Sequence, residues 1–292
     1  MPSRTSGIRN GQRLMAVHAH PDDESSKGAA TLARYAEEGA QVMVCTLTDG
    51  ARGDVLNPNM DRPEVWENLP RLRQEEMERA RQILGVEQQF LGFADSGLPS
   101  EGEELPDGCF ALTSLSESAG RLVAAIRSFR PHVLVTYDEI GGYPHPDHIK
   151  TNQVAVEAFS AAADFARYPD AGVPWQPLKL YYICAFSKAY FQAMYEAMTA
   201  AGLDSPHGAV LDEWDDAQPT WAITTQVHCP EYFETRKQAQ LAHTTQMDPD
   251  GPVFQCPIDL EQKAWPTEDY HLARSLVSIA LPEEDLFAGI QP

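Results

Sequence analysis

The chain has 292 residues, of which 43% are hydrophobic and 9% aromatic, which is the composition of a folded globular protein and excludes disorder for most of its length. Its 22 basic and 43 acidic residues leave a formal charge of −21, which argues against binding to nucleic-acid phosphates or an anionic membrane. No apolar run approaches the roughly 18 to 20 residues that span a bilayer, the first twelve residues lack the apolar segment of a signal peptide, and the five cysteines are widely spaced. We therefore expect a cytoplasmic protein with reduced thiols and no nucleic-acid or membrane partner.

Strand and helix patterns alternate along the first half of the chain. The run at 13–18 is short and apolar, and the segment that follows it has apolar residues at helical spacing up to Gly39. This alternation predicts an α/β protein with a Rossmann-like, mostly parallel, doubly wound sheet. The expected elements are strands at 13–18, 41–47, 88–92 and 132–137, helices at 27–38, 71–84, 116–129 and 151–165, and polar loops at 51–70 and 94–107.

The second half of the chain is less regular. The residue patterns favour strands at 178–186 and 220–227 and a helix at 230–243, whereas 248–257 and the tail from 281 look irregular. No linker of low complexity separates the halves. We therefore expect one domain over residues 1–292, with the second half as a C-terminal elaboration of the sheet.

Two clusters of possible ligands each follow an apolar strand. The first, at 18–24, reads HAHPDDE, and the second, at 143–148, reads YPHPDH. Ligands of open α/β sheets bind outside the carboxyl ends of the strands, so we expect both clusters at the same edge of the sheet. Either cluster alone could be a turn or a helix cap. Their joint placement favours a metal site.

Histidine and aspartate are suitable ligands for a catalytic zinc ion, and two histidines with one carboxylate also suit Fe²⁺. We expect His20, Asp23 and His148 to hold the metal, because the spacing of His20 and Asp23 lets one turn direct both side chains to one ion. The side chain of Asp22 diverges from that of Asp23. Asp22 is therefore the expected general base beside a water molecule that the metal makes more acidic.

The motifs at 19–24 and 145–148 resemble those of the LmbE/PIG-L family of zinc-dependent N-deacetylases. The longer segments at 15–28, 91–97 and 141–148 resemble the branch of this family that cleaves mycothiol S-conjugates, and the similarity extends from about residue 13 to the C-terminus. A departure is Ile140, where related sequences usually have Asn before Gly-Gly-Tyr; this puts in doubt a polar contact from that position.

The resemblance implies an LmbE-like metal-dependent amidase. Its small-molecule substrate would be a mycothiol S-conjugate, in which an amide joins glucosamine-inositol to cysteine. Hydrolysis would release a mercapturic acid and glucosaminyl-inositol, in detoxification. The alternatives in the same family are deacetylation of N-acetylglucosaminyl-inositol, in biosynthesis of the same thiol, and another N-deacetylation. The sequence leaves the oligomeric state open.

The clusters and the resemblance together suggest three further catalytic residues. Tyr143 would donate a hydrogen bond to the oxyanion, and His145 would protonate the leaving amine as general acid. Asp147 would compensate the charge of a protonated His145. The structural alternatives are packing of the loop for Tyr143 and a turn for Asp147.

Four residues are weaker candidates. The resemblance makes Arg73 and Asp95 candidates for contacts with sugar or inositol hydroxyls, although Arg73 by itself could belong to a solvated helix face. Lys27 follows the first motif closely and is a candidate for contact with the substrate, or else a lysine that opens a surface helix. His243, near the end of a predicted helix, is as compatible with a cap or a core position as with the site.

Two other classes of protein are less compatible with the sequence. A non-haem Fe(II) oxygenase could use the same ligand types, but those enzymes typically have a jelly-roll β fold. A nucleotide-binding module would have a glycine-rich loop after the first strand, where this chain has His and Asp.

Overall fold

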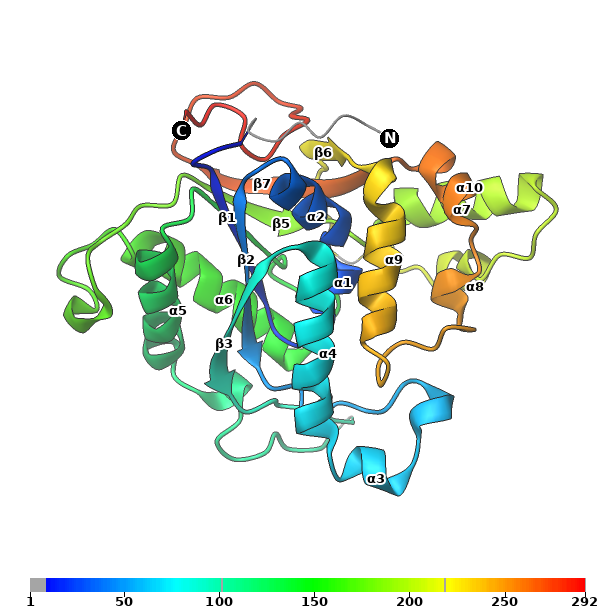
Figure 1. Cartoon of the computed structure of the whole chain (residues 1–292), viewed down its shortest axis with the longest axis horizontal. Helices are drawn as coiled ribbons and strands as arrows, with labels where there is room; N and C mark the ends of the chain where they lie inside the picture. Colours follow the sequence, from blue (N-terminus) through cyan, green and yellow to red (C-terminus); the bar gives the residue numbers. More distant parts are fainter. Residues whose placement is uncertain (1–8, 101, 218, 292) are drawn as a thin grey trace.

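The computed structural model describes residues 9–100, 102–217 and 219–291, and the strands of these residues form one seven-stranded sheet (Figure 1). The first eight residues of the polar N-terminal segment lie outside the described ranges. The strand order is β3-β2-β1-β4-β5-β7-β6. The first five strands in this order run parallel to one another, and β7 runs antiparallel to both its neighbours. The strands are β1 (Arg13–His18), β2 (Gln41–Thr48), β3 (Glu87–Phe93), β4 (Val133–Thr136), β5 (Lys179–Ile183), β6 (Thr225–His228) and β7 (Thr267–Ser275).

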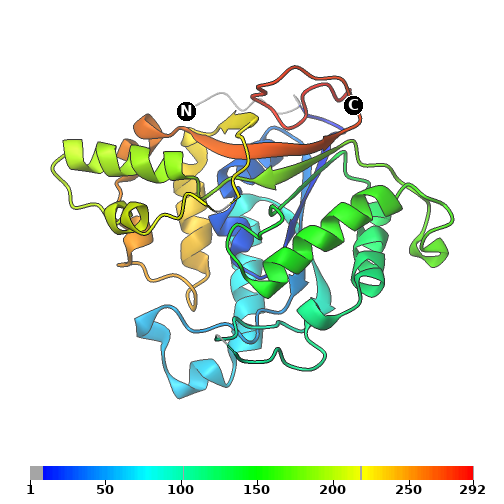
Figure 2. The same ribbon diagram turned by 180° about the vertical axis from the view of Figure 1, so that it is seen from behind.

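Helices cover both faces of this sheet. The α-helices are α1 (Asp23–Ser26), α2 (Ala29–Glu37), α3 (Pro63–Trp66), α4 (Leu69–Leu84), α5 (Leu115–Phe129), α6 (Pro146–Ala161), α7 (Lys188–Ala200), α8 (His207–Asp212), α9 (Phe233–Ala242) and α10 (Ile258–Ala264). Short 3-10 turns are η1 (Pro58–Met60), η2 (Phe110–Leu112), η3 (Pro169–Ala171), η4 (Pro230–Tyr232) and η5 (Pro252–Phe254). Helices α2, α4 and α9 lie on one face (Figure 1), and α5 and α6 lie on the other (Figure 2).

The alternation of side chains along β1 divides the core into two layers. Leu14 and Ala16 pack with the apolar faces of α2, α4 and α9, whereas Met15 and Val17 pack with α5 and α6. Strands that are buried on both faces need continuous apolar runs, which is why β1 and β4 were recognisable in the sequence. The predicted fold class, a mostly parallel doubly wound sheet with a C-terminal elaboration, is confirmed.

Two predicted helix boundaries near the clusters are wrong. The helix expected at 27–38 begins at Ala29, because Gly28 has a φ of +97° and separates it from the short helix α1. The helix expected at 151–165 begins at Pro146. The side chain of His145 caps it by accepting a hydrogen bond from the backbone N–H of Asp147 at 3.1 Å. The second cluster is therefore the first turn of α6.

The C-terminal part contains more structure than its pattern indicated. Helices α7, α8 and α10 and strand β7 were not predicted. Strand β7 is rich in polar residues, but tertiary contacts satisfy them: the carboxylate of Glu268 accepts hydrogen bonds from the backbone N–H groups of Ala30 and Thr31 at the start of α2. No helix of the described residues has the length and apolar character needed to cross a membrane.

Candidate metal centre and active site

The two clusters meet at the carboxyl ends of the strands. Residues 20–24 follow β1, residues 95 and 96 follow β3, and residues 137–148 follow β4. The strand order reverses between β1 and β4, which are hydrogen-bonded neighbours. This reversal is the place where open α/β sheets bind their ligands.

His20, Asp23 and His148 lie together at this edge and are buried, with exposed fractions of 7%, 3% and 0%. Their candidate ligand atoms all lie within 4.8 Å of one another. Asp23 Oδ2 is 3.4 Å from His20 Nδ1 and 3.4 Å from His148 Nε2. His148, which is 125 residues after Asp23 along the chain, thus joins His20 and Asp23 in one cluster, as the sequence predicted from the order of the strands.

The hydrogen bond at one ring nitrogen of His148 leaves the other nitrogen available as a ligand atom. Its Nδ1 lies 3.0 Å from the carbonyl oxygen of Gly141. Because a carbonyl can only accept a hydrogen bond, Nδ1 is the donor, and in the neutral ring Nε2 keeps a lone pair. Nε2 is buried and has no hydrogen-bond partner among the described residues. A buried lone pair beside a carboxylate oxygen is an arrangement that a divalent cation satisfies, so the residues present fit a metal ion.

The surroundings of His20 favour positive charge. Its Nε2 is 3.3 Å from Asp147 Oδ2 and 3.4 Å from Asp95 Oδ1, while Nδ1 faces Asp23. Burial lowers the pKa of His20, but hydrogen bonds to Asp147, Asp23 and Asp95 outweigh burial and raise it well above its ordinary value. Carboxylates on the outer side of a ligating histidine also orient the ring and increase its basicity.

A second set of possible ligands, His20, Asp95 and His145, is equally close-spaced. The hydrogen bonds of His145 make this set the poorer one. Its Nδ1 accepts the backbone N–H of Asp147, so neutral His145 holds its proton on Nε2 and has no lone pair left for a metal. Burial and the rings of His20 and His148 lower the pKa of His145 to about 3.

Asp22 lies beside the three candidate ligands in a strained backbone conformation. It precedes α1 with a φ of +124°, which is rare for a residue with a side chain. Its Oδ1 accepts a hydrogen bond from Arg73 Nη2 at 3.1 Å, and its backbone N–H donates to Glu24 Oε2 at 2.9 Å. Burial raises the pKa of Asp22, with Arg73 opposing and Asp23 adding to the rise. A carboxyl group with a raised pKa suits a general base.

Glu24 and His243 support this conformation from behind. Glu24 Oε1 is 2.8 Å from His243 Nε2, and both side chains are fully buried. Burial raises the pKa of Glu24, but His243 and Ser25 outweigh burial and lower it to about 2. The glutamate of the first motif is thus tied to the end of α9. The sequence left His243 open between a core position and the site, and the structure places it in a buried pair that touches the motif.

Tyr143 lies beside the cluster, whereas the Asp147 carboxylate has other partners than the sequence suggested. Tyr143 is 42% exposed, and its ring centroid is 4.7 Å from that of His148, so this side chain lies beside the cluster and is partly open to solvent. The expected pairing of the Asp147 carboxylate with His145 is wrong. That carboxylate accepts hydrogen bonds from the backbone N–H and the hydroxyl of Ser96 and contacts His20, because the first turn of α6 directs it toward the end of β3.

The three candidate substrate contacts are more buried than expected. Lys27 Nζ donates to Asp23 Oδ1 at 2.6 Å. Arg73 Nη1 and Nη2 donate to the carbonyl oxygens of Gly50 and Pro21, and Arg73 also binds Asp22. Asp95 accepts the backbone N–H groups of residues 52 and 97. With exposed fractions of 2% to 7%, all three residues also support the cluster.

The sequence analysis missed two supporting residues. The Tyr137 hydroxyl donates to Asp23 Oδ2 at 2.6 Å and accepts the backbone N–H of Ala19 at 2.8 Å, and its ring stacks on His148 at 4.2 Å. Ser96 holds Asp147 as described above. A polar residue directly after an apolar strand was the available signal for Tyr137, because it places a hydroxyl at the carboxyl edge.

Replacing Gly141 by Ala is expected to weaken metal binding about 10- to 100-fold, as loss of an orienting contact to a metal ligand does. Gly141 has a φ of +79°, and an added Cβ would lie 2.6 Å from the Cβ of His148. The substitution would move the carbonyl that orients His148. Gly142→Ala is the matched control, since its φ is +73° but a Cβ there meets nothing within 4 Å among the described residues. Titration of both variants with Zn²⁺ measures the difference, and equal affinities would contradict the role of Gly141.

Comparison with known proteins agrees with this arrangement. The family model PIG-L, GlcNAc-PI de-N-acetylase, matches residues 15–159, which contain both clusters. The chain is 51% identical to mycothiol S-conjugate amidase of Streptomyces coelicolor, over 96% of this chain and 97% of that one. It is 40% identical to 1D-myo-inositol 2-acetamido-2-deoxy-alpha-D-glucopyranoside deacetylase of Geodermatophilus obscurus, over 96% and 98%.

A solved structure shares the fold. N,N'-diacetylchitobiose deacetylase from Pyrococcus horikoshii superposes with a TM-score of 0.61 at 17% identity, covering 89% of this chain and 83% of that chain. The matched family model spans the residues that form the cluster, and full-length relatives align along nearly the whole chain. The chain belongs to the PIG-L, or LmbE-like, family of de-N-acetylases.

Proposed function

We propose that the protein hydrolyses the amide bond between glucosamine-inositol and the cysteine of mycothiol S-conjugates, giving a mercapturic acid and glucosaminyl-inositol in the cytoplasm. The observation that carries this proposal is the 51% identity, over 96% of the chain, to a protein named mycothiol S-conjugate amidase. We also propose that residues 1–292 work as one domain, because β5, β6 and β7 belong to the same sheet that carries the candidate ligands.

His20, Asp23 and His148 would hold a divalent metal ion, Zn²⁺ or Fe²⁺. When bound, such an ion would lower the pKa of water and polarise the amide carbonyl. The nitrogen and oxygen donors of the three residues suit either metal. The buried lone pair on His148 Nε2 and the acidic surroundings of His20 support this assignment.

Asp22 is the proposed general base that takes a proton from the attacking water, and the Tyr143 hydroxyl would donate a hydrogen bond to the oxyanion of the substrate. His145 is the proposed general acid for the leaving amine. Its pKa of about 3 leaves the free ring neutral. Negative charge that develops on the substrate beside the ring would raise this pKa, so that Nδ1 can take a proton when it releases the Asp147 N–H. The ring can then donate its Nε2 proton to the leaving nitrogen and return to the neutral form. Asp147 and Asp95 would keep His20 oriented.

The substrate would lie across the reversal in strand order. Arg73 binds the carbonyl oxygen of Gly50 in the loop after β2, and Asp95 follows β3, so we propose that the sugar and inositol lie on this side of the cluster. Lys27, which pairs with Asp23, would adjust the charge of the ligand set and approach the substrate from the first motif.

The second candidate is deacetylation of N-acetylglucosaminyl-inositol, which the 40% identity to a protein of that named activity supports. A side-by-side assay of amine release from a bimane conjugate of mycothiol and from the acetylated sugar separates the two. We expect kcat/KM to be at least about tenfold higher for the conjugate, because only the conjugate offers the larger acyl group for binding. Faster release of acetate would reverse the assignment. An iron-dependent oxygenase would instead consume oxygen, and its typical jelly-roll fold differs from this sheet.

A further inference from the structure

A cavity of about 460 Å³ opens beside the candidate metal ligands, on the side of β4 and β5. Tyr137 and Gly142 line the end nearest the cluster, and the Tyr137 hydroxyl is the one that binds Asp23. The far walls are mainly apolar, with Phe186, Trp214, Trp221 and Ile223, and they also carry the ion pair of Lys188 and Asp216. A cavity of this size and lining suits a small organic group, with room for an aromatic ring system.

The far walls come from a part of the chain that the family model does not cover. The model matches residues 15–159, whereas the far walls come from the segment between β5 and β6, which contains α7 and α8. The candidate metal ligands and Asp22 therefore lie in the part of the chain that the family model matches, and the C-terminal elaboration completes the cavity. A chain can change its substrate by changing such an elaboration while its reaction stays the same.

Other aromatic rings hold the walls of the cavity in place. Phe186 stacks on Phe191 with 6.3 Å between ring centroids, and Phe191 lies 6.0 Å from Trp214. Trp221 packs edge-on against Tyr182 at 6.5 Å. Phe186 remains 45% exposed, and Lys27 Nζ lies 5.6 Å from its ring centroid. Preformed aromatic walls bind a flat apolar group without a large ordering cost.

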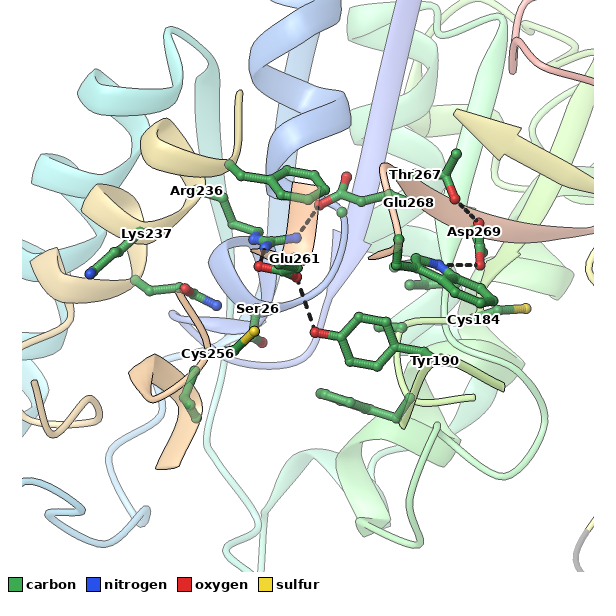
Figure 3. A pocket seen from close by; sticks show the side chains of 18 of the residues that line it. Ser26, Cys184, Tyr190, Arg236, Lys237, Cys256, Glu261, Thr267, Glu268 and Asp269 are labelled. Atoms are coloured by element: carbon green, nitrogen blue, oxygen red, sulfur yellow. Dashed lines mark hydrogen bonds and ion pairs between the residues drawn. The ribbon is translucent and has the colours of Figure 1, made fainter. Parts of the chain in front are cut away.

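A second cavity, of about 140 Å³, adjoins the first and shares residues 183–186 with it, but more of its lining is charged or polar (Figure 3). Its charged groups pair with one another: Arg236 Nη2 lies 2.6 Å from Glu261 Oε2, and the Tyr190 hydroxyl donates to Glu261 Oε1 at 3.0 Å. These partners satisfy Arg236, Glu261 and Tyr190 in the smaller cavity. The larger cavity presents apolar surface that the described residues leave uncovered.

We propose that the larger cavity binds the S-substituent of the substrate, as an apolar and preferably aromatic group, while the amide lies at the candidate metal ligands. This inference rests on the proposed function and names the part of the chain that selects the conjugate. The strand order supports this placement of the S-substituent and the sugar on opposite sides of the amide. The proposed sugar contacts lie at the loops after β2 and β3, whereas the cavity lies at the segments after β4 and β5, so the two arms of the amide would extend to opposite sides of β1.

Two variants and two substrates test this proposal. Trp214→Ala removes an aromatic wall, and Ala189→Phe places a ring into the cavity from the first turn of α7. Mycothiol conjugates carrying S-bimane and S-methyl groups share the amide and the sugar. Both variants are expected to lower the ratio of kcat/KM for S-bimane over S-methyl about tenfold, mainly through KM. Val210→Ala, at an exposed position of α8 outside the lining, is the matched control and should keep the wild-type ratio.

An unchanged ratio in both Trp214→Ala and Ala189→Phe would overturn the proposal. Equal losses on both substrates would also overturn it, because they would indicate a general structural role. Binding of the product analogue N-acetyl-S-bimane-cysteine, followed by bimane fluorescence, tests the cavity without turnover. If the wild-type protein cleaves only the acetylated sugar, the proposed function fails. Tighter binding of this probe to wild type than to Trp214→Ala would still support the cavity, and equal binding would refute it.

Discussion

Replacing Asp22 by Asn is expected to slow turnover about 10²- to 10⁴-fold while the protein keeps its metal. Asn cannot take a proton from water, but it has nearly the same shape and can still accept the hydrogen bond from Arg73. Asp22 belongs to neither of the two close-spaced ligand sets. The strained backbone of Asp22 and its raised pKa both fit a group that is held for proton transfer rather than for stability. Single-turnover rates on the bimane conjugate, with elemental analysis of the same samples, measure both effects.

Asp259→Asn is the matched control for this change. It makes the same substitution at an exposed position of α10, where the carboxylate pairs with Lys263, and should leave both rate and metal content as in wild type. Loss of metal from Asp22→Asn would show that Asp22 is a ligand. Retained metal with a rate close to wild type would remove Asp22 from the role of base.

The meeting of the two clusters was predictable because it depends on strand order rather than on detailed contacts. β1 and β4 are apolar and buried on both faces, so each is visible in the sequence, and each is followed by polar residues within a few positions. Parallel strands in one sheet bring these residues to the same edge. The structure pairs Leu14 with Val133, which makes the two strands direct neighbours.

The partners within the cluster were not predictable, because they depend on side chains from distant elements. Sequence proximity suggested that Asp147 would serve His145. The first turn of α6 instead directs its carboxylate to Ser96 and His20. Arg73 has the pattern of a solvated helix face, yet it is only 3% exposed, because three oxygen acceptors around the first motif bind its guanidinium. Buried polar residues of this kind have no periodic signal.

The C-terminal elaboration escaped prediction for a related reason. Strand β7 lies between β5 and β6, but its sequence has polar residues at positions where an isolated strand would be apolar. Asp269 is satisfied by Trp265, Thr267 and Gln226. Such compensation arises only in the folded chain. The far walls of the apolar cavity come from this same part, so sequence reasoning located the reacting groups better than the surface proposed to select the substrate.

Replacing His148 by Ala is expected to abolish metal retention and to lower kcat/KM by at least about 10³-fold, because a metal ion supplies several kcal/mol of transition-state stabilisation. The basis is the lone pair on His148 Nε2, which the hydrogen bond from Nδ1 to Gly141 leaves free. Elemental analysis after dialysis and a Zn²⁺ titration measure retention directly, without reference to activity. His228→Ala is the matched control, since this histidine lies on β6 at an exposed position and should keep the metal content of wild type.

The parallel variant His145→Ala decides between the two close-spaced ligand sets. If His20, Asp23 and His148 bind the metal, His145→Ala keeps the ion and loses rate, because only the proposed proton donor is removed. If His20, Asp95 and His145 bind it, the pattern reverses, and His148→Ala keeps its metal. The hydrogen bond from Asp147 N–H to His145 Nδ1 predicts the first result, because it leaves the proton of neutral His145 on Nε2, where a ligand would need a lone pair. Metal loss in His145→Ala with retention in His148→Ala would therefore refute the proposed ligand set and, with it, the place of the amide in the site.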